Sequence, residues 1–228
     1  MLDFSNSKIL IVGDVMLDKY YFGKVDRISP EAPVPIVNIQ KEESRLGGAS
    51  NVANNIVSLG GHSLLCGVIG HDLFGKEIER ISRHKNIDTF LLKTSSPTIT
   101  KARIIGGKQQ IVRVDYEDKS ELNADNKKLF RDTISRILPE YDILVISDYG
   151  KGLISEDLCR YLIKLAHKYD KKVIIDPKGK NWEKYSGADI VTPNVKELSD
   201  IVGYTVPNTD RAIEKAAREA ITNNHLTA

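Results

Sequence analysis

The sequence predicts an α/β fold with a doubly wound, mostly parallel sheet, and two observations carry this prediction. Strand-like runs alternate with helical segments along most of the chain, which is typical of right-handed crossovers and of a sheet covered by helices on both faces. The first run, residues 8–14, is apolar on both faces, as a central parallel strand should be. A chain of 228 residues is long enough for one such domain with its own core, so no second domain is required.

The elements of this sheet follow from local patterns. Val52, Ile56 and Leu59 form an apolar stripe at helical spacing, which predicts a helix that ends at the glycine pair 60–61. Ser155 precedes two acidic residues and is a typical helix cap. We expect strands at 8–14, 63–69, 143–147, 173–175 and 190–192, and further helices at 74–85, at 126–138 before Pro139, after Ser155 and after Asn194.

Two segments interrupt the alternation, at about 15–45 and 96–116. The first holds short strand-like pieces and three prolines between residues 30 and 35, a density that favours an edge strand or a loop over a central strand. The second holds two strand-like runs separated by the glycine pair 106–107, which indicates a β-hairpin. Together these segments predict a small β layer beside the main sheet.

Composition excludes several classes of partner. Lys+Arg number 33 and Asp+Glu number 31, for a formal charge of +2 without a basic block, so nothing indicates nucleic acid or an anionic membrane as a partner. No apolar run approaches the roughly 20 residues of a membrane span, and no signal peptide is evident. Cys66 and Cys159 lack metal-site or redox-pair spacing and are interpreted as reduced core cysteines of a cytoplasmic protein.

A candidate ligand site begins at Gly47 and Gly48, which lead directly into the helix that contains Asn51. Two glycines allow the backbone to approach a ligand closely, and a helix N-terminus offers unpaired N–H groups and the positive end of a dipole. The pattern predicts a cradle for a polar ligand. A helix with a flexible lead-in has the same pattern, and this alternative stays open.

A second candidate feature is the polar residue that follows each of four predicted strands. Asp14, Asp148 and Asp176 end three of them, and Asn194 follows the fourth after one proline. Ligands of open parallel sheets bind outside the carboxyl ends of the strands. Any one of these residues could be a solvated loop residue or a helix cap, but four together predict a site.

Several motifs give a resemblance to a known family. They are Gly13-Asp14 with Asp18, the string Arg27 to Pro35, Leu46 to Asn55, Asp148 to Gly152, Asp176-Pro177-Lys178 and Thr192 to Glu197. With these motifs the chain resembles the ribokinase-like sugar kinases and, among them, the bacterial heptose 7-phosphate kinases of ADP-heptose biosynthesis. The resemblance covers essentially the whole chain and implies a ribokinase-like fold in which the β layer is a lid.

The resemblance implies transfer of the γ-phosphoryl group of ATP, with Mg²⁺, to the anomeric hydroxyl of heptose 7-phosphate, giving heptose 1,7-bisphosphate for lipopolysaccharide precursors. In such a transfer, positioning and charge neutralisation supply most of the catalysis. The resemblance also implies a homodimer formed through the lid. A second copy would cover the exposed apolar residues of a thin β layer.

The resemblance assigns roles residue by residue. Asp14 and Asp18 would accept hydrogen bonds from sugar hydroxyls, Gly47, Gly48 and Asn51 would close on the sugar, and Asp148 and Asp176 would complete its site. The candidate cations for the distal phosphate are Lys101, Arg113, Lys151 and Lys178. Asn194 and Glu197 would bind the nucleotide phosphates, with Glu197 as a Mg²⁺ ligand.

One part of the family pattern is missing. The Gly-Ala-Gly-Asp segment that supplies the anion hole and the catalytic base in the family does not occur in this sequence. No catalytic base is therefore assigned, and we expect a kinase domain that is incomplete at its C-terminal end and inactive alone. Two alternatives stay open: a kinase of another sugar or sugar phosphate, and a non-catalytic module that binds sugar phosphates and dimerises.

Overall fold

The structure is a computed structural model that describes residues 3–227. Its main sheet has six strands, all parallel, in the order β10-β9-β8-β1-β4-β5. The strands are β1 (Lys8–Gly13), β4 (His62–Gly70), β5 (Asp88–Thr94), β8 (Ile143–Ser147), β9 (Lys172–Asp176) and β10 (Ile190–Val191). The predicted α/β class is confirmed, and β5 is a strand that we did not predict.

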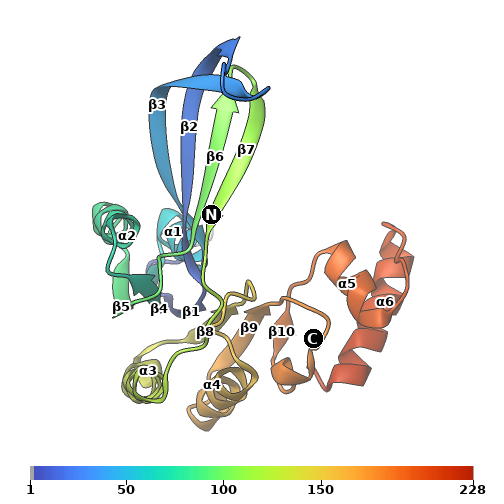
Figure 1. Cartoon of the computed structure of the whole chain (residues 1–228). Helices are drawn as coiled ribbons and strands as arrows, with labels where there is room; N and C mark the ends of the chain where they lie inside the picture. The colour runs from blue at the N-terminus through green and yellow to red at the C-terminus, as the bar shows by residue number, and fades with distance from the viewer. Residues whose placement is uncertain (1–2, 228) are drawn as a thin grey trace.

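Helices cover both faces of this sheet. Successive residues of β1 point to opposite sides and are apolar, so both sides of the strand must be buried. Leu10 and Val12 pack in the core formed with α3 (Ala124–Ile137) and α4 (Glu156–Lys168). Ile9 and Ile11 pack in the core formed with α1 (Ala49–Ser58) and α2 (Leu73–His84). Figure 1 shows this layering, with α5 (Val195–Val202) and α6 (Asp210–Asn224) beyond β10.

The lid is a separate sheet in the order β3-β2-β6-β7 that projects from the main sheet (Figure 1). It consists of β2 (Val15–Ile28), β3 (Pro35–Gly48), β6 (Thr100–Gly106) and β7 (Gln109–Tyr116). Pro35 begins an edge strand, as prolines in sheets should. The predicted β layer is confirmed, but the first segment forms two strands of 14 residues rather than short pieces. Register shifts, such as that between Phe22 and Gly23, interrupt the alternation that would have revealed a continuous strand.

The predicted helix ends are correct to within about two residues. α3 begins earlier than predicted, because the Asn123 side chain caps it by accepting from Asn126 N. Pro139 lies in a short 3₁₀ turn (Leu138–Glu140) that follows α3. The caps predicted at Ser155 and Asn194 are both present.

Candidate functional site

The four polar residues predicted at strand ends lie along one edge of the main sheet, because β1, β8, β9 and β10 are neighbours. Asp14 follows β1, Asp148 follows β8, Asp176 ends β9, and Asn194 caps the helix after β10. Their surroundings differ, so the side chains have different roles.

Asp14 is almost fully buried, with 2% of its surface exposed. Its Oδ2 atom accepts hydrogen bonds from Tyr149 N at 2.8 Å and Lys151 N at 3.1 Å, and its carbonyl accepts from Ala49 N at 3.0 Å. Burial raises the pKa of the Asp14 carboxyl to about 6. Asp14 therefore joins β1 to the loop after β8 and to the start of α1, while Oδ1 has no hydrogen-bond partner.

Asp148 is also buried, and both of its carboxylate oxygens are occupied. Oδ1 accepts from Gly150 N at 2.7 Å, and Oδ2 accepts from the Tyr185 hydroxyl at 2.7 Å and from Lys184 Nζ. Asp148 thus fastens the loop after β8 to the 3₁₀ turn Glu183–Tyr185. Asp148, which is predicted to bind the substrate, therefore has hydrogen-bond partners within the protein for both oxygens.

One face of the lid carries two cross-strand rows of polar residues. Directly opposed residues of adjacent strands lie on the same face of a sheet. The first row is Arg45, Asp18, Lys101 and Asp115, and the second is Glu43, Tyr20, Arg103 and Arg113. The first row alternates basic and acidic groups, whereas the second places two arginines side by side. The two rows include three of the predicted residues, Asp18, Lys101 and Arg113.

This face borders a cavity of about 640 Å³, here called the lid pocket. Four basic side chains line it, from Arg45, Lys85, Lys101 and Arg103, against one carboxylate, from Asp18. Because cations outnumber carboxylates, the pocket favours an anionic ligand.

The cations of the lid pocket are held in different ways. Arg103 Nη1 donates to Asp18 Oδ1 at 2.6 Å, and the Arg45 and Arg103 guanidinium groups lie 4.9 and 5.1 Å from the centre of the Tyr20 ring. Lys101 has no ion-pair partner among the residues that the structure describes. Burial lowers the pKa of Lys101, so an anion in the pocket would offset an existing desolvation cost.

The floor of the lid pocket is the predicted glycine cradle, with Gly47, Gly48 and Asn51. Gly48 has a φ of 54°, and a Cβ atom added there would lie 2.4 Å from the Asp14 carbonyl oxygen. Gly48 precedes α1 without a side-chain cap, so the helix N-terminus is not closed by a side chain of its own. Asn54 also lines the pocket, and its Oδ1 atom is buried without a partner.

A smaller cavity of about 270 Å³, the strand-end pocket, contains Asp176, Lys178, Asn194 and Glu197. Asn194 and Glu197 form a reciprocal capping box at the start of α5, and Lys178 Nζ donates to Glu197 Oε1 at 2.9 Å. Burial, together with the nearby Glu197 carboxylate, raises the pKa of Asp176. Tyr149 lines both this pocket and the lid pocket, so the two cavities adjoin at its side chain.

The donor set of the strand-end pocket fits a magnesium ion bound together with phosphate groups. Mg²⁺ is usually bound through one or two carboxylates and the oxygens of substrate phosphates, and Asp176 and Glu197 are two carboxylates whose repulsion a cation would relieve. Within residues 3–227, no group of three or more His, Cys, Asp or Glu side chains forms a metal site of its own.

The four basic residues predicted for the distal phosphate do not gather in one place. Only Lys101 lines the lid pocket. Lys151 pairs with Glu117, Lys178 lies in the strand-end pocket, and Arg113 lies beside Arg103 on the outer strand with its guanidinium bound to Asp115. The pocket residues missed by sequence reasoning are Tyr20, Arg45, Asn54, Lys85, Arg103 and Tyr149. Alternation along the lid strands was the signal for Tyr20, Arg45 and Arg103.

Comparison with known proteins adds independent information. The model of the pfkB family carbohydrate kinases matches residues 6–226. The chain belongs to this family. As a pfkB-family chain it shares its fold with phosphofructokinase-2 from Escherichia coli in complex with substrates and products (TM-score 0.74, 19% identity, 96% of this chain and 70% of that chain). Ribokinase from Arabidopsis thaliana, complexed with ribose and ATP, gives a TM-score of 0.69 at 18% identity, covering 96% and 70% of the two chains.

Two curated relatives of this pfkB-family chain are more similar in sequence. The bifunctional protein HldE of Helicobacter pylori strain P12 is 48% identical over 193 residues, which are 84% of this chain and 42% of HldE. The D-beta-D-heptose 7-phosphate kinase of Bordetella bronchiseptica is 43% identical over 215 residues, 94% of this chain and 67% of that enzyme. The chain therefore spans less than half the length of the bifunctional relative. Among residues 3–227, every helix is too short or too polar to cross a membrane.

Proposed function

We propose that this chain binds heptose 7-phosphate as the sugar-binding part of an ATP-dependent heptose 7-phosphate kinase that supplies heptose 1,7-bisphosphate for ADP-heptose and lipopolysaccharide precursors. Identities of 43–48% to a heptose 7-phosphate kinase and to HldE support this substrate. The single observation that carries the proposal is the lid pocket, where cations and unpaired polar groups surround a volume large enough for a phosphosugar.

The two ends of the substrate fit different parts of the lid pocket. Arg45, Lys101 and Arg103 are the cations we assign to the distal phosphate, because guanidinium and ammonium groups bind phosphate by charge-assisted hydrogen bonds. Asn51 and the unpartnered Asn54 Oδ1 are suited to sugar hydroxyls. Asp18 keeps Arg103 in place and has a second oxygen available for a hydroxyl.

The nucleotide end of the reaction belongs to the strand-end pocket in this proposal. Asp176, Asn194 and Glu197 would hold the Mg²⁺ and phosphate end of ATP. Bound Mg²⁺ supplies neutralisation of phosphate charge. The chain's own contribution is to position the two ligands. Because the two pockets adjoin at Tyr149, ATP in one would lie next to the phosphosugar in the other.

No described residue is placed to act as the base for the sugar hydroxyl. Asp14 and Asp148 hold the loop after β8, and the Gly-Ala-Gly-Asp segment does not occur in the sequence. This observation favours a second candidate function for the polypeptide by itself, a module that binds the phosphosugar without turning it over.

We also propose that the chain works in the cytoplasm as a homodimer joined through the lid. The lid face opposite the lid pocket carries apolar residues that include Ile104, Val112 and Val114, and the latter two are exposed. A second copy could cover this face in a symmetric interface.

A ligand titration combined with a turnover assay tests the proposal. Calorimetry with heptose 7-phosphate, fructose 6-phosphate and ribose 5-phosphate should give the tightest binding with the heptose. A coupled assay with ATP and Mg²⁺ then separates the two candidate functions, since we expect binding without turnover by this chain. Preference for another phosphosugar would reject the substrate that we propose.

A further inference from the structure

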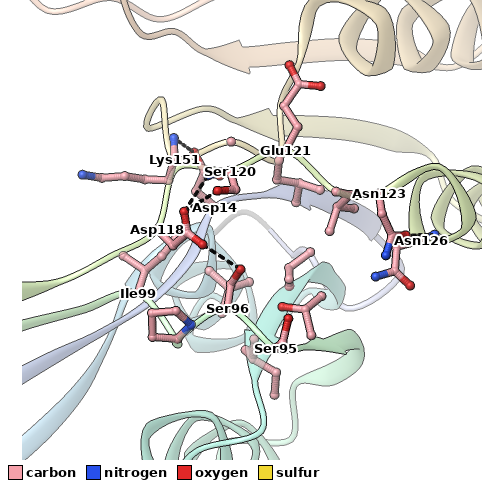
Figure 2. Close-up of a pocket in the computed structure, with 18 of the residues that line it drawn as sticks. Asp14, Ser95, Ser96, Ile99, Asp118, Ser120, Glu121, Asn123, Asn126 and Lys151 are labelled. Carbon is pink, nitrogen blue, oxygen red and sulfur yellow. Dashed lines mark hydrogen bonds between the residues drawn. The ribbon is translucent and has the colours of Figure 1, made fainter.

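A third cavity, of about 230 Å³, lies at the base of the lid and shares no lining residue with the lid pocket or the strand-end pocket. We call it the hinge cavity, because its walls are the two linkers that attach the second half of the lid, residues 94–99 and 118–123 (Figure 2). Its floor is formed by residues at the ends of β1 and β4, including Val68.

The walls of the hinge cavity are held by hydrogen bonds within the protein. Ser96 Oγ donates to Asp118 Oδ2 at 3.0 Å and joins the two linkers. The Thr98 backbone N–H and hydroxyl both donate to Asp72 at 2.7 Å, which fixes the first linker to the N-cap of α2. The cavity is therefore formed before any ligand enters, as small-molecule sites usually are.

Two residues that line this cavity each have a buried polar atom without a hydrogen-bond partner. One is Oδ1 of Asp14, whose side chain is nearly fully buried, and the other is the Thr94 hydroxyl oxygen. Leaving a buried polar atom unpaired is costly, so each such atom in a native protein calls for a partner. A hydroxyl-bearing ligand in the hinge cavity would provide partners for both.

The charge of the hinge cavity is opposite to that of the lid pocket. Lys151 is the only basic residue among its described lining residues, and its ammonium pairs with Glu117 and points away from the cavity (Figure 2). Carboxylates of Asp14 and Asp118 and amides of Asn123 and Asn126 line the space instead. Such a lining repels phosphate and is rich in acceptors for hydroxyl donors.

We propose that the hinge cavity binds an uncharged, polyhydroxylated molecule of about monosaccharide size. A water molecule takes up about 30 Å³ of the liquid, so the cavity has room for several waters or for one such molecule. Val68, Ile99 and Leu153 supply apolar surface for the carbon skeleton. This inference does not depend on the proposed kinase function, because it concerns different residues.

Titration of the ¹⁵N-labelled protein with D-mannose tests the inference. We expect saturable shifts of the backbone amides of Ser95, Ser96 and Ser120, and we expect mannose 6-phosphate to leave these amides unmoved. Shifts confined to Gly47, Gly48 and Asn51 would place mannose in the lid pocket and overturn the inference. An absence of saturable shifts, or equal shifts with the 6-phosphate, would overturn it as well.

Two substitutions sharpen the test. Thr94→Val keeps the side-chain shape, removes one hydrogen bond and should weaken mannose binding about 3- to 10-fold, whereas Val68→Phe should fill the cavity and abolish binding. Thr89→Val, at an exposed position of β5 that lines none of the three cavities, is the matched control and should leave mannose affinity unchanged. A dispersed ¹⁵N spectrum confirms that each variant is folded, and a folded Thr94→Val variant that binds mannose normally would contradict the proposal.

Discussion

Asp18 and Arg103 form a half-buried ion pair across the lid strands, with Arg103 Nη1 2.6 Å from Asp18 Oδ1. The pair keeps the guanidinium in the lid pocket next to the Tyr20 ring. Removing the arginine leaves the Asp18 carboxylate without its partner and reduces the cations of the lid pocket from four to three, so a phosphate would be held less tightly.

The first prediction is that Arg103→Ala weakens binding of heptose 7-phosphate by about 10- to 100-fold, the range for a charged hydrogen bond. Arg113→Ala is the matched control, since Arg113 is directly opposite on β7 but does not line the pocket. It should change affinity less than about threefold, within the small effect of an exposed charge. Equal losses in the two variants, measured by calorimetry, would mean that the phosphate lies farther out on the lid.

The second prediction concerns Gly48, which combines a left-handed φ with close backbone contact. Gly48→Ala should lower the free energy of unfolding by about 1–3 kcal/mol or more, because strain and a clash add. Gly60→Ala is the control, because Gly60 has a φ of 91° but open space around an added Cβ. Denaturant unfolding measures both, and a loss at Gly60 as large as that at Gly48 would argue against the clash with the Asp14 carbonyl.

The third prediction follows from the raised pKa of Asp14. Its folded value is about 6 and its ordinary value is 3.8, so between about pH 4 and pH 6 the folded state binds the proton more tightly than the unfolded state. Stability contributed by this group is present at low pH and is lost as the pH rises through 6. Asp14→Asn cannot ionise, so its free energy of unfolding relative to wild type should improve by up to about 3 kcal/mol between pH 4 and pH 7. A pH-independent difference would show that Asp14 titrates normally.

The fourth prediction concerns assembly. A lysine at Val112 and at Val114 places charge on the apolar face of the lid, opposite the rows that line the pocket. If two copies pair through this face, Val112→Lys/Val114→Lys should be monomeric by light scattering while the wild type is dimeric. A monomeric wild type, or a variant that remains dimeric, would remove the support for a lid-mediated dimer.

The fold and the location of the strand-end site could be predicted from local patterns, because parallel strands necessarily deliver Asp14, Asp148, Asp176 and Asn194 to one edge. The contacts that these side chains make, and hence their roles, could not be predicted from local patterns. Asp148 is occupied by Lys184 and Tyr185, which lie 36 and 37 residues later in the chain and meet it only after folding.

The lid shows the same limit. The prolines and the glycine pair 106–107 predict that a lid exists. Which of its basic residues face the lid pocket depends on how the strands are aligned with one another. Arg103 and Arg45 reach the lid pocket because β2 pairs with β6 and β3 in one particular register. Alternation shows which residues of a strand share a face, but it does not show which residue of the next strand lies opposite, and the bulges between Phe22 and Arg27 shift the register of β2 with β3.

Paired calorimetric titrations with heptose 7-phosphate and unphosphorylated heptose measure whether the lid pocket recognises the phosphate of the sugar. We expect at least about tenfold tighter binding of the phosphate ester, as is usual for charge-assisted hydrogen bonds, and we expect Lys101→Met largely to remove this preference. Equal affinities for the two sugars, or a preference that persists in the double variant Lys101→Met/Arg103→Ala, would show that the lid pocket does not bind the phosphate.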